Sequence, residues 1–357
     1  MARILALVLL VLPAAVRAEE QHFLYVVAPG IRNYLEFGGA GVLVFDMGRG
    51  HAFVKRIETP ASRVAKPENV KGVCACAANR KLYFSTLTQL YCLDLVTEKT
   101  LWAKVLPGGC DRMSITPDGK TLYVPTLEKD HWNIVDGATG ELVTRIETKS
   151  KSHNTVVNVD GSRAYLAGLG SPVLRVADTK THKVIQEIGP FSAAIRPFTV
   201  GRNRVYVNVN KLLGFEVADL ATGKVLHRVE VLGYQQGMVK RHGCPSHGVG
   251  LTPDEKEAWV CDAANSRVHV FDLTADPPKQ TASVVLREQP GWVTFSLDGR
   301  HAYPSTGEVI DVKTKKIVAA LKDEKGREVH SEKMIEVVFS DGVPVRNGDQ
   351  FGLGRVK

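Results

Sequence analysis

The feature that most constrains the fold is a repeating group of four short strand patterns. Residues 113–146 show it most clearly, because the turn sequences Thr116–Gly119 and Asp136–Gly140 separate their apolar runs. Proline presets φ, and glycine accepts the positive φ that a tight reversal needs. After the first run, the apolar or alternating runs are Thr121–Pro125, Trp132–Val135 and Glu141–Ile146. This segment therefore predicts a meander of four antiparallel strands.

The same pattern recurs over nearly the whole chain, with a period of roughly 40 to 48 residues. Strand patterns in other copies include Phe23–Val27, Lys81–Phe84, Arg163–Leu166, Ala258–Val260 and His301–Tyr303. Seven copies are present, and the period is typical of four-stranded propeller blades. The sequence therefore predicts an all-β fold, a seven-bladed β-propeller of four-stranded antiparallel blades.

The two ends of the repeat array predict how the ring closes. The first copy begins at Phe23–Val27 and lacks the strand that should precede it. Near the C-terminus, Ile335–Phe339 runs into Ser340–Gly342, a turn of the kind that ends this strand in other copies. We therefore expect the C-terminal strand to pair into the first blade, which covers sheet edges that would otherwise be exposed. The tail, Val343–Lys357, is then expected to lie over the ring.

The first 18 residues have the pattern of a secretory signal peptide. A basic start at Met1–Arg3 precedes an apolar run, Ile4–Val16, and the small residues Val16 and Ala18 fit a cleavage site. The alternative is a membrane anchor, but the run is short for a span of about 20 residues. We expect residues 19–357 to form one propeller domain, exported to the periplasm or secreted, with no membrane span after cleavage.

Charge and cysteine content narrow the classes of partner. The chain has 46 basic and 38 acidic residues, a net charge of +8, without a dense basic tract that would predict nucleic-acid binding. No C-x-x-C sequence occurs among the six cysteines, so redox or c-type haem attachment motifs are absent. Cys244 and Cys261 flank the first strand of one copy, which permits a disulfide in an exported protein. The sequence names no protein partner.

The repeats resemble the YVTN-repeat β-propeller family, exported proteins often described as surface-layer or lactonase-like propellers. The resemblance rests on a Pro-Asp-Gly turn at 117–119, the Leu-Tyr-Val strand at 122–124 and V-x-D-x-x-T-G patterns such as 217–223. It covers nearly the whole chain after residue 18 and implies a seven-bladed ring. It does not decide activity, because related rings include lactonases, lyases, copper enzymes and binding proteins.

The ends of the innermost strands converge on the central tunnel, where ligands usually bind in this architecture. We call the end at which these strands begin the tunnel mouth. When the copies are aligned on their Asp-Gly turns, polar and aromatic residues fall at the strand starts, where packing alone would favour small or aliphatic residues. These residues are Asp111, Arg112, His153, Asn154, Arg196, His247 and Trp292. The alignment therefore predicts one ligand site at the mouth.

One hypothesis for this site is a metal centre. Asp111, His153 and His247 would supply two imidazoles and one carboxylate, a donor set that suits one divalent transition metal with open positions. His242 and His330 lie on loops expected near the same mouth and are candidate additional ligands. A metal there could assist a hydrolase or lyase.

A second hypothesis is a site for a small anionic or sugar-derived ligand. Arg112 and Arg196 would hold the anion through charge-assisted hydrogen bonds, Asn154 would add an amide, and Trp292 would stack on the ligand. This arrangement suits a lactone or a uronate. It predicts a binding or scaffold protein of the YVTN type.

The histidines add an enzymatic alternative at the same place. His153 or His247 could act as general acid or base near neutral pH, as in a lactonase-like hydrolase or lyase. In a purely structural alternative, Asp111 pairs with Arg112 or Arg196, and backbone carbonyls satisfy the histidines. These alternatives differ in whether the polar side chains point at one another or at a shared space.

Overall fold

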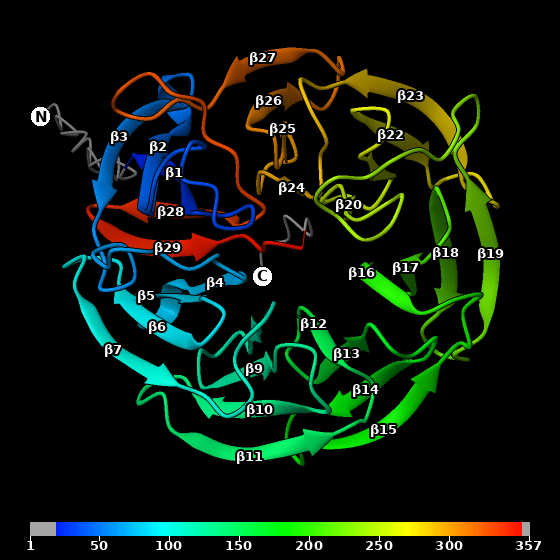
Figure 1. The fold of residues 1–357 in the computed structure, drawn as a ribbon, viewed down its shortest axis with the longest axis horizontal. Coiled ribbons are helices and arrows are strands. Elements are labelled where there is room, and N and C mark those ends of the chain that lie inside the picture. The colour runs from blue at the N-terminus through cyan, green and yellow to red at the C-terminus, as the bar shows by residue number, and fades with distance from the viewer. Residues whose placement is uncertain (1–18, 352–357) are drawn as a thin grey trace, which may run out of the picture.

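The computed structural model describes residues 19–351 and shows seven β-sheets arranged in a ring (Figure 1). Six sheets have four antiparallel strands, and the sheet that contains both ends of the described chain has five. The predicted seven-bladed β-propeller is confirmed. The predicted signal peptide, residues 1–18, lies outside the described residues.

The blades follow one another along the chain, and the first also contains the C-terminal strands. The first blade consists of β1 (Glu20–Ala28), β2 (Gly41–Asp46), β3 (Ala52–Ile57), β28 (Met334–Ser340) and β29 (Val343–Asn347). The second consists of β4 (Gly72–Cys76), β5 (Lys81–Ser85), β6 (Gln89–Asp94) and β7 (Thr100–Val105). The third consists of β8 (Ser114–Ile115), β9 (Thr121–Pro125), β10 (His131–Asp136) and β11 (Leu142–Glu147).

The remaining four blades repeat this order from the centre outward. The fourth has β12 (Ser152–Val157), β13 (Arg163–Gly168), β14 (Leu174–Asp178) and β15 (Lys183–Ile188). The fifth has β16 (Ile195–Val200), β17 (Arg204–Val209), β18 (Gly214–Asp219) and β19 (Val225–Glu230). The sixth has β20 (Val249–Leu251), β21 (Glu257–Asp262), β22 (Arg267–Asp272) and β23 (Lys279–Val285). The seventh has β24 (Val293–Phe295), β25 (His301–Pro304), β26 (Glu308–Asp311) and β27 (Ile317–Ala320).

Two short 3-10 helices lie in the turns of the first two blades: η1 (Met47–Arg49) connects β2 to β3, and η2 (Ala77–Asn79) connects β4 to β5. Within residues 19–351, no helix has the length and apolarity needed to cross a membrane.

The turn sequences close the strands as the repeat predicts. In the third blade, the Thr116 hydroxyl lies 2.7 Å from the Asp118 carboxylate, and the Gly119 amide donates to the Thr116 carbonyl at 2.8 Å. Gly119 has φ +71°, a conformation that glycine adopts without a steric penalty. At the next hairpin, Asp136 accepts hydrogen bonds from the backbone amides of Ala138 and Thr139. The local sequence thus fixes where each strand ends.

The C-terminal strand closes the ring. β28 pairs antiparallel with β1 from Glu20 opposite Ser340 to Val26 opposite Met334, which confirms the predicted closure. β29 then adds a fifth strand beside β28, and Figure 1 shows it directed toward the ring centre. Gln350, three residues after β29, is buried and bonds to the second and third blades: its Oε1 accepts from the Val73 amide of β4, and its Nε2 donates to the carbonyl of Met113, directly before β8, both at 2.9 Å. The segment 347–351 therefore lies inside the ring centre rather than over the ring.

The hydrophobic core lies within and between the blades. Trp132, Trp259, Tyr83 and Tyr123 are completely buried there. The six cysteines are buried and free, so the disulfide that the spacing of Cys244 and Cys261 permits is absent. Disulfides are most needed in small domains that cannot build a sufficient hydrophobic core, and this ring has a large packed core.

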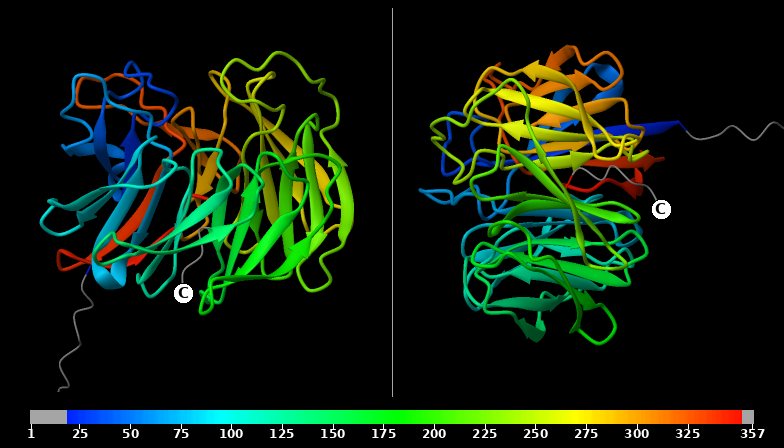
Figure 2. Two further views of the ribbon diagram at one scale, coloured as in Figure 1. Left: turned by 60° about the horizontal axis from the view of Figure 1, so that its bottom comes forward. Right: turned by 90° about the vertical axis from the view of Figure 1, so that its right-hand side faces the viewer.

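Three long loops stand at the same end of the ring, as the left view of Figure 2 shows at its upper edge in blue, yellow-green and orange. They join β1 to β2 (residues 29–40), β19 to β20 (231–248) and β27 to β28 (321–333), and we call them the mouth loops. Arg32 donates to the Arg241 carbonyl at 2.7 Å, and Phe37 stacks on His330 with ring centroids 4.3 Å apart. These contacts join the three loops above the inner strand starts.

Candidate functional site

The inner strand starts lie side by side, as the alignment of the copies predicts. Arg112 and Asn154 form a parallel β-bridge between neighbouring blades. A Cβ added to Gly72 would lie 3.1 Å from the Arg112 Cα, and one added to Gly248 would lie 2.7 Å from the Trp292 Cα. Glycine therefore allows neighbouring blades to approach at these two points. The start positions of adjacent blades face each other around the mouth.

Arg112 is the buried cation at the centre of this site. Its side chain is almost fully buried, and its guanidinium carbon lies 3.9 Å from the centre of the Trp292 ring, a cation–π contact. Nη2 donates to the Glu332 carboxylate. The other two guanidinium nitrogens, Nε and Nη1, are buried and have no hydrogen-bond partner within residues 19–351. Arg112 thus retains donors that the described protein does not satisfy.

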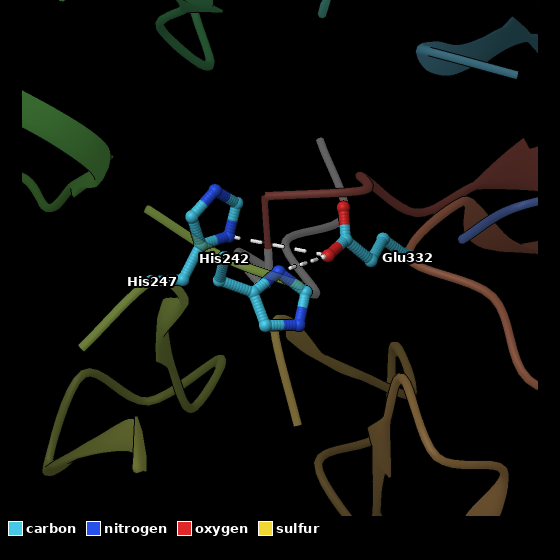
Figure 3. Close-up of side chains that lie close together, drawn as sticks. All are labelled: His242, His247 and Glu332. Carbon is cyan, nitrogen blue, oxygen red and sulfur yellow. Dashed lines mark ion pairs between the residues drawn. The ribbon is translucent and has the colours of Figure 1, made fainter. Parts of the chain in front are cut away.

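Glu332 lies opposite two histidines, as Figure 3 shows. Its Oε1 is 3.2 Å from Nδ1 of His242 and 4.0 Å from Nδ1 of His247, and the two imidazole rings are 4.8 Å apart. Its Oε2 accepts from Arg112 and, at 3.0 Å, from Nζ of Lys333. His247 Nδ1 also lies 2.9 Å from the Gly291 carbonyl oxygen. All three residues of this cluster are buried.

Burial and neighbouring charges set the protonation states of the cluster. Burial lowers the pKa of His242, and it lowers that of His247 well below the usual range, although Glu332 opposes both shifts. Burial also disfavours an ionised Glu332, but Lys333 and Arg112 outweigh it and hold its pKa well below the usual range. Near neutral pH the mouth therefore contains neutral imidazoles beside an ionised carboxylate.

A second pair of ionisable groups, Asp111 and His153, lies at neighbouring strand starts. His153 Nδ1 is 2.6 Å from the Asp111 carboxylate, whose other oxygen lies 3.3 Å from Nζ of Lys71. Burial opposes ionisation of Asp111, but His153 and Lys71 lower its pKa to about 2. Burial lowers the pKa of His153 despite the adjacent carboxylate. The imidazole is therefore neutral near pH 7, and Asp111 orients it.

The other predicted site residues have different surroundings. Both polar atoms of the Asn154 side chain are buried without a hydrogen-bond partner within residues 19–351. Arg196 is half-buried and donates to the Asn210 side chain at 2.6 Å and to the Gly243 carbonyl at 3.0 Å. His330 bonds to Glu288 at 2.9 Å and stacks on Phe37. Asn154 thus keeps both polar atoms unpartnered among the described residues, whereas Arg196 and His330 contact the mouth loops.

The potential metal ligands assemble differently from the predicted set. Among residues 19–351, the group of three whose ligand atoms lie within 4.8 Å of one another is His242, His247 and Glu332. It contains two of the predicted histidines, while Asp111 and His153 form the separate pair described above. Asp111 pairs with His153 and Lys71, and Arg112 pairs with Glu332, so the expected Asp111–arginine pair is not the main contact of either residue.

Sequence reasoning missed Glu332, Lys333 and the packing role of Gly291. Met334 occupies, in the closing copy, the position of Asp111 and His153, and Glu332 and Lys333 lie just before this aligned position. A Cβ at Gly291 would lie 2.1 Å from Cε1 of His242, which shows that this glycine leaves room for the cluster. The adjacent charges Glu332 and Lys333 directly before an apolar strand were the one available signal.

Comparison with known proteins supports the fold. No protein-family model and no curated protein sequence matches this chain. Among solved structures, Kuenenia stuttgartiensis hydrazine synthase is similar with a TM-score of 0.56 and 17% identity, covering 72% of this chain and 80% of that chain. The dihydro-heme d1 dehydrogenase NirN in complex with DHE is similar with a TM-score of 0.62 and 16% identity, covering 91% of this chain and 72% of that chain. At this identity the similarity concerns the β-propeller fold.

Proposed function

We propose that this protein is an exported, YVTN-type β-propeller that binds a small anionic or sugar-derived ligand at its tunnel mouth. The observation that carries the proposal is the pair of buried guanidinium nitrogens of Arg112 that lack a partner within residues 19–351. An unsatisfied buried donor costs roughly 1 to 3 kcal/mol, and more when it is charged. A carboxylate that accepts from one of these nitrogens would reduce this cost, and further oxygens of a citrate or a uronate would accept from the second.

The surroundings of Arg112 fit such a ligand. Asn154, on the neighbouring strand start, offers a donor and an acceptor that are buried and unpartnered within the described residues. Trp292 presents an aromatic ring to the guanidinium and forms one wall of the site. The similarity in fold to NirN, whose structure holds DHE, supports a ligand-binding role for a ring of this kind.

The proposal is tested by measuring the binding of citrate, glucuronate and acetate to the purified protein by titration calorimetry. Arg112→Met should weaken binding roughly 100-fold, because charge-assisted hydrogen bonds contribute about 1.5 to 3 kcal/mol each. Arg196→Met is the matched control, since the Arg196 guanidinium already bonds to Asn210 and the Gly243 carbonyl. Equal losses in both variants would contradict the assignment of Arg112 as the anion anchor.

Asn154→Leu separates a ligand-binding role from a structural one. The change removes two buried polar atoms that bond to no described residue, so thermal stability should stay the same or rise. Ligand affinity should fall about tenfold, because one or two hydrogen bonds to the ligand are lost. A destabilised variant with unchanged affinity would show that Asn154 serves the fold and not a ligand.

The Asp111–His153 pair favours a second candidate function, a histidine-assisted hydrolase or lyase. The carboxylate at 2.6 Å from Nδ1 holds that nitrogen as the N–H, which leaves a lone pair on Nε2. A neutral imidazole oriented in this way can take a proton from an attacking water or from a carbon next to a carboxylate. A lactone or uronate anchored by Arg112 would be the substrate class.

This second candidate is tested by following δ-lactone hydrolysis and uronate elimination with the purified protein. His153→Gln should lower kcat by roughly 100- to 10,000-fold, the usual contribution of a general base. His330→Gln is the control, because His330 contacts Phe37 and Glu288 in the mouth loops. Turnover no faster than buffer, with citrate still bound, would leave the binding function and remove the enzymatic one.

A further inference from the structure

We propose that His242, His247 and Glu332 form a binding site for one divalent transition metal ion at the tunnel mouth. Two imidazoles and one carboxylate are a donor set that favours zinc, iron, cobalt or nickel over magnesium and calcium. The three ligand atoms lie within 4.8 Å of one another, and all three side chains are buried. The inference does not depend on the anion proposal, because its three ligands are other side chains and it concerns a different ligand class.

The geometry needs only a small closure to reach metal-binding distances. Bonds of about 2.1 Å in a tetrahedral site place ligand atoms about 3.4 Å apart. Glu332 Oε1 is already 3.2 Å from Nδ1 of His242, while Nδ1 of His247 lies 4.0 Å away. The ligand nitrogens of the two histidines lie within 4.8 Å of each other, so the rings have to approach by up to about 1.4 Å. His247 also has to exchange its contact with the Gly291 carbonyl for the metal. His242 and His247 lie on one mouth loop and Glu332 on another, so side-chain and loop adjustments can supply this movement.

The surroundings orient Glu332 toward the two histidines. Arg112 and Lys333 both bind Oε2 of Glu332, which orients the carboxylate and leaves Oε1 directed at the histidines. Such outer contacts typically orient metal ligands and are worth 10- to 100-fold in affinity. The two cations also repel a metal ion, but Arg112 spreads its charge over a planar group that faces Trp292.

A second, independent observation comes from His242. Its side chain is more than nine-tenths buried, and its Nε2 has no hydrogen-bond partner within residues 19–351. Purely structural histidines in a core are normally satisfied through hydrogen bonds on their ring nitrogens. Gly291 leaves room for this ring, since a Cβ there would lie 2.4 Å from the same Nε2. A neutral imidazole has one N–H and one lone pair. With the proton on Nδ1, facing Glu332, the lone pair of Nε2 is unused; with the proton on Nε2, the lone pair of Nδ1 faces Glu332 and can bind a metal between them.

The experiment loads the purified protein, first treated with a chelator, with Co²⁺ and separately with Zn²⁺. Bound metal is counted by plasma mass spectrometry after gel filtration, and the visible absorption of Co²⁺ reports nitrogen coordination. We expect about one equivalent per chain. His242→Ala, His247→Ala and Glu332→Gln should each weaken binding at least tenfold. His153→Ala is the control and should bind as the wild type does, because His153 pairs with Asp111 and is not part of the cluster.

The outcomes separate this site from the alternatives. Circular dichroism and thermal unfolding first establish that each variant is folded. Loss of metal in His153→Ala as well as His247→Ala, with retention in His242→Ala, would overturn the proposal in favour of a centre at Asp111, His153 and His247. Absence of stoichiometric Co²⁺ and Zn²⁺ from the folded wild type would also overturn it. Citrate titration of the metal-free protein tests the anion site separately, so one proposal can fail while the other stands.

Discussion

The two ends of the ring centre are built from the same inner strands, yet they differ in chemistry. At the mouth, ionisable side chains face one another, and Arg112, Asn154 and His242 retain atoms without partners within residues 19–351. The opposite end has a cavity of about 250 Å³, lined by strand residues such as Cys74 and by the C-terminal segment. There the polar side chain of Asn347 is satisfied: it donates to the Ala75 carbonyl and accepts from the Ala77 amide, both at 2.9 Å.

The difference concerns the ionisable cluster, because single atoms without a partner within residues 19–351, such as Arg346 Nε, also occur at the opposite end. At the end opposite the mouth, Asn347 and Gln350 use their amides to bond the C-terminal segment to the inner strands, so polarity there serves closure of the ring. At the mouth, the backbone at the strand starts is already paired between blades, as at Arg112 and Asn154. Unsatisfied buried polar groups are rare in native proteins, and they require an explanation where they occur. The explanation that we favour is a ligand at the mouth.

The largest effect is expected from closing the space beside the mouth cluster. In Gly291→Ala the added Cβ would lie 2.1 Å from Cε1 of His242 and 2.3 Å from Oε1 of Glu332, so both side chains must move. We expect Co²⁺ affinity to fall roughly 1,000-fold, or about 4 kcal/mol. Gly48→Ala is the control, because its Cβ would meet only the Asp46 side chain, at 3.3 Å. Metal binding in Gly291→Ala equal to that of the control would contradict the location of the site.

The next largest effect is expected at the end opposite the mouth, where a substitution should lower the stability of the fold and leave ligand binding unchanged. Gln350→Leu removes one hydrogen bond from the Val73 amide and one to the Met113 carbonyl, and both backbone groups stay buried. Each unsatisfied group costs about 1 to 3 kcal/mol, so we expect the free energy of unfolding to fall by about 3 kcal/mol. Chemical denaturation measures this value, with Asn347→Leu as a second variant of the same end. A variant as stable as the wild type would show that these two hydrogen bonds of Gln350 do not stabilise the ring centre.

The repeat made most of the fold predictable, because its turns have local causes. β9 spans Thr121–Pro125 as predicted, and β28 pairs with β1 as the incomplete first copy required. β29 was not predicted, since Val343–Asn347 has no counterpart in the other copies against which it could be aligned. β29 forms at the inner edge of the first blade through tertiary contacts, which cannot be predicted from a single sequence.

The sequence predicted where the candidate residues lie along the inner strands, but it did not predict which side chains contact one another. Alignment placed Arg112 and Asn154 at equivalent positions of neighbouring copies, and the structure shows a backbone bridge between them. It could not indicate that Glu332, from a loop, reaches Arg112 and His242, because loop conformations are not fixed by the repeat. Partner choice among buried charges depends on distances of a few ångströms, and the spacing of residues in a repeat does not determine these.

A smaller effect, on the pH dependence of stability, is expected from His51, a buried histidine away from the mouth. His51, in the turn between β2 and β3, bonds to the Tyr303 hydroxyl at 2.9 Å, and burial, with His301 nearby, lowers its pKa to about 4. The unfolded chain binds this proton near pH 6.5, so it holds more protons than the folded state between pH 6.5 and 4. Stability contributed by neutral His51 is therefore fully present above pH 6.5 and is lost as pH falls toward 4.

His51→Gln should remove this part of the acid sensitivity. The difference in unfolding free energy between wild type and variant should change by up to about 3 kcal/mol from pH 7 to pH 4, with the wild type losing more. Urea denaturation at several pH values measures it, and comparing the two proteins cancels the titration of all other groups. Parallel curves over this range would show that His51 is not held neutral by its burial. His301→Gln, which removes the neighbouring imidazole, is the matched second variant.

The smallest effect is expected in the reactivity of thiols at the end opposite the mouth. Cys74 and Cys76 line the cavity there. Burial raises the pKa of Cys74 well above its usual range, with a further contribution from Asp349, so the thiolate that would react is scarce. We expect iodoacetamide at pH 8 to modify none of the six buried cysteines of the folded protein and all six after denaturation. Mass spectrometry counts the added groups. Rapid modification of Cys74 or Cys76 in the folded protein would mean that this cavity opens to reagents. The end opposite the mouth would then also offer chemically reactive side chains, which would contradict the difference between the two ends.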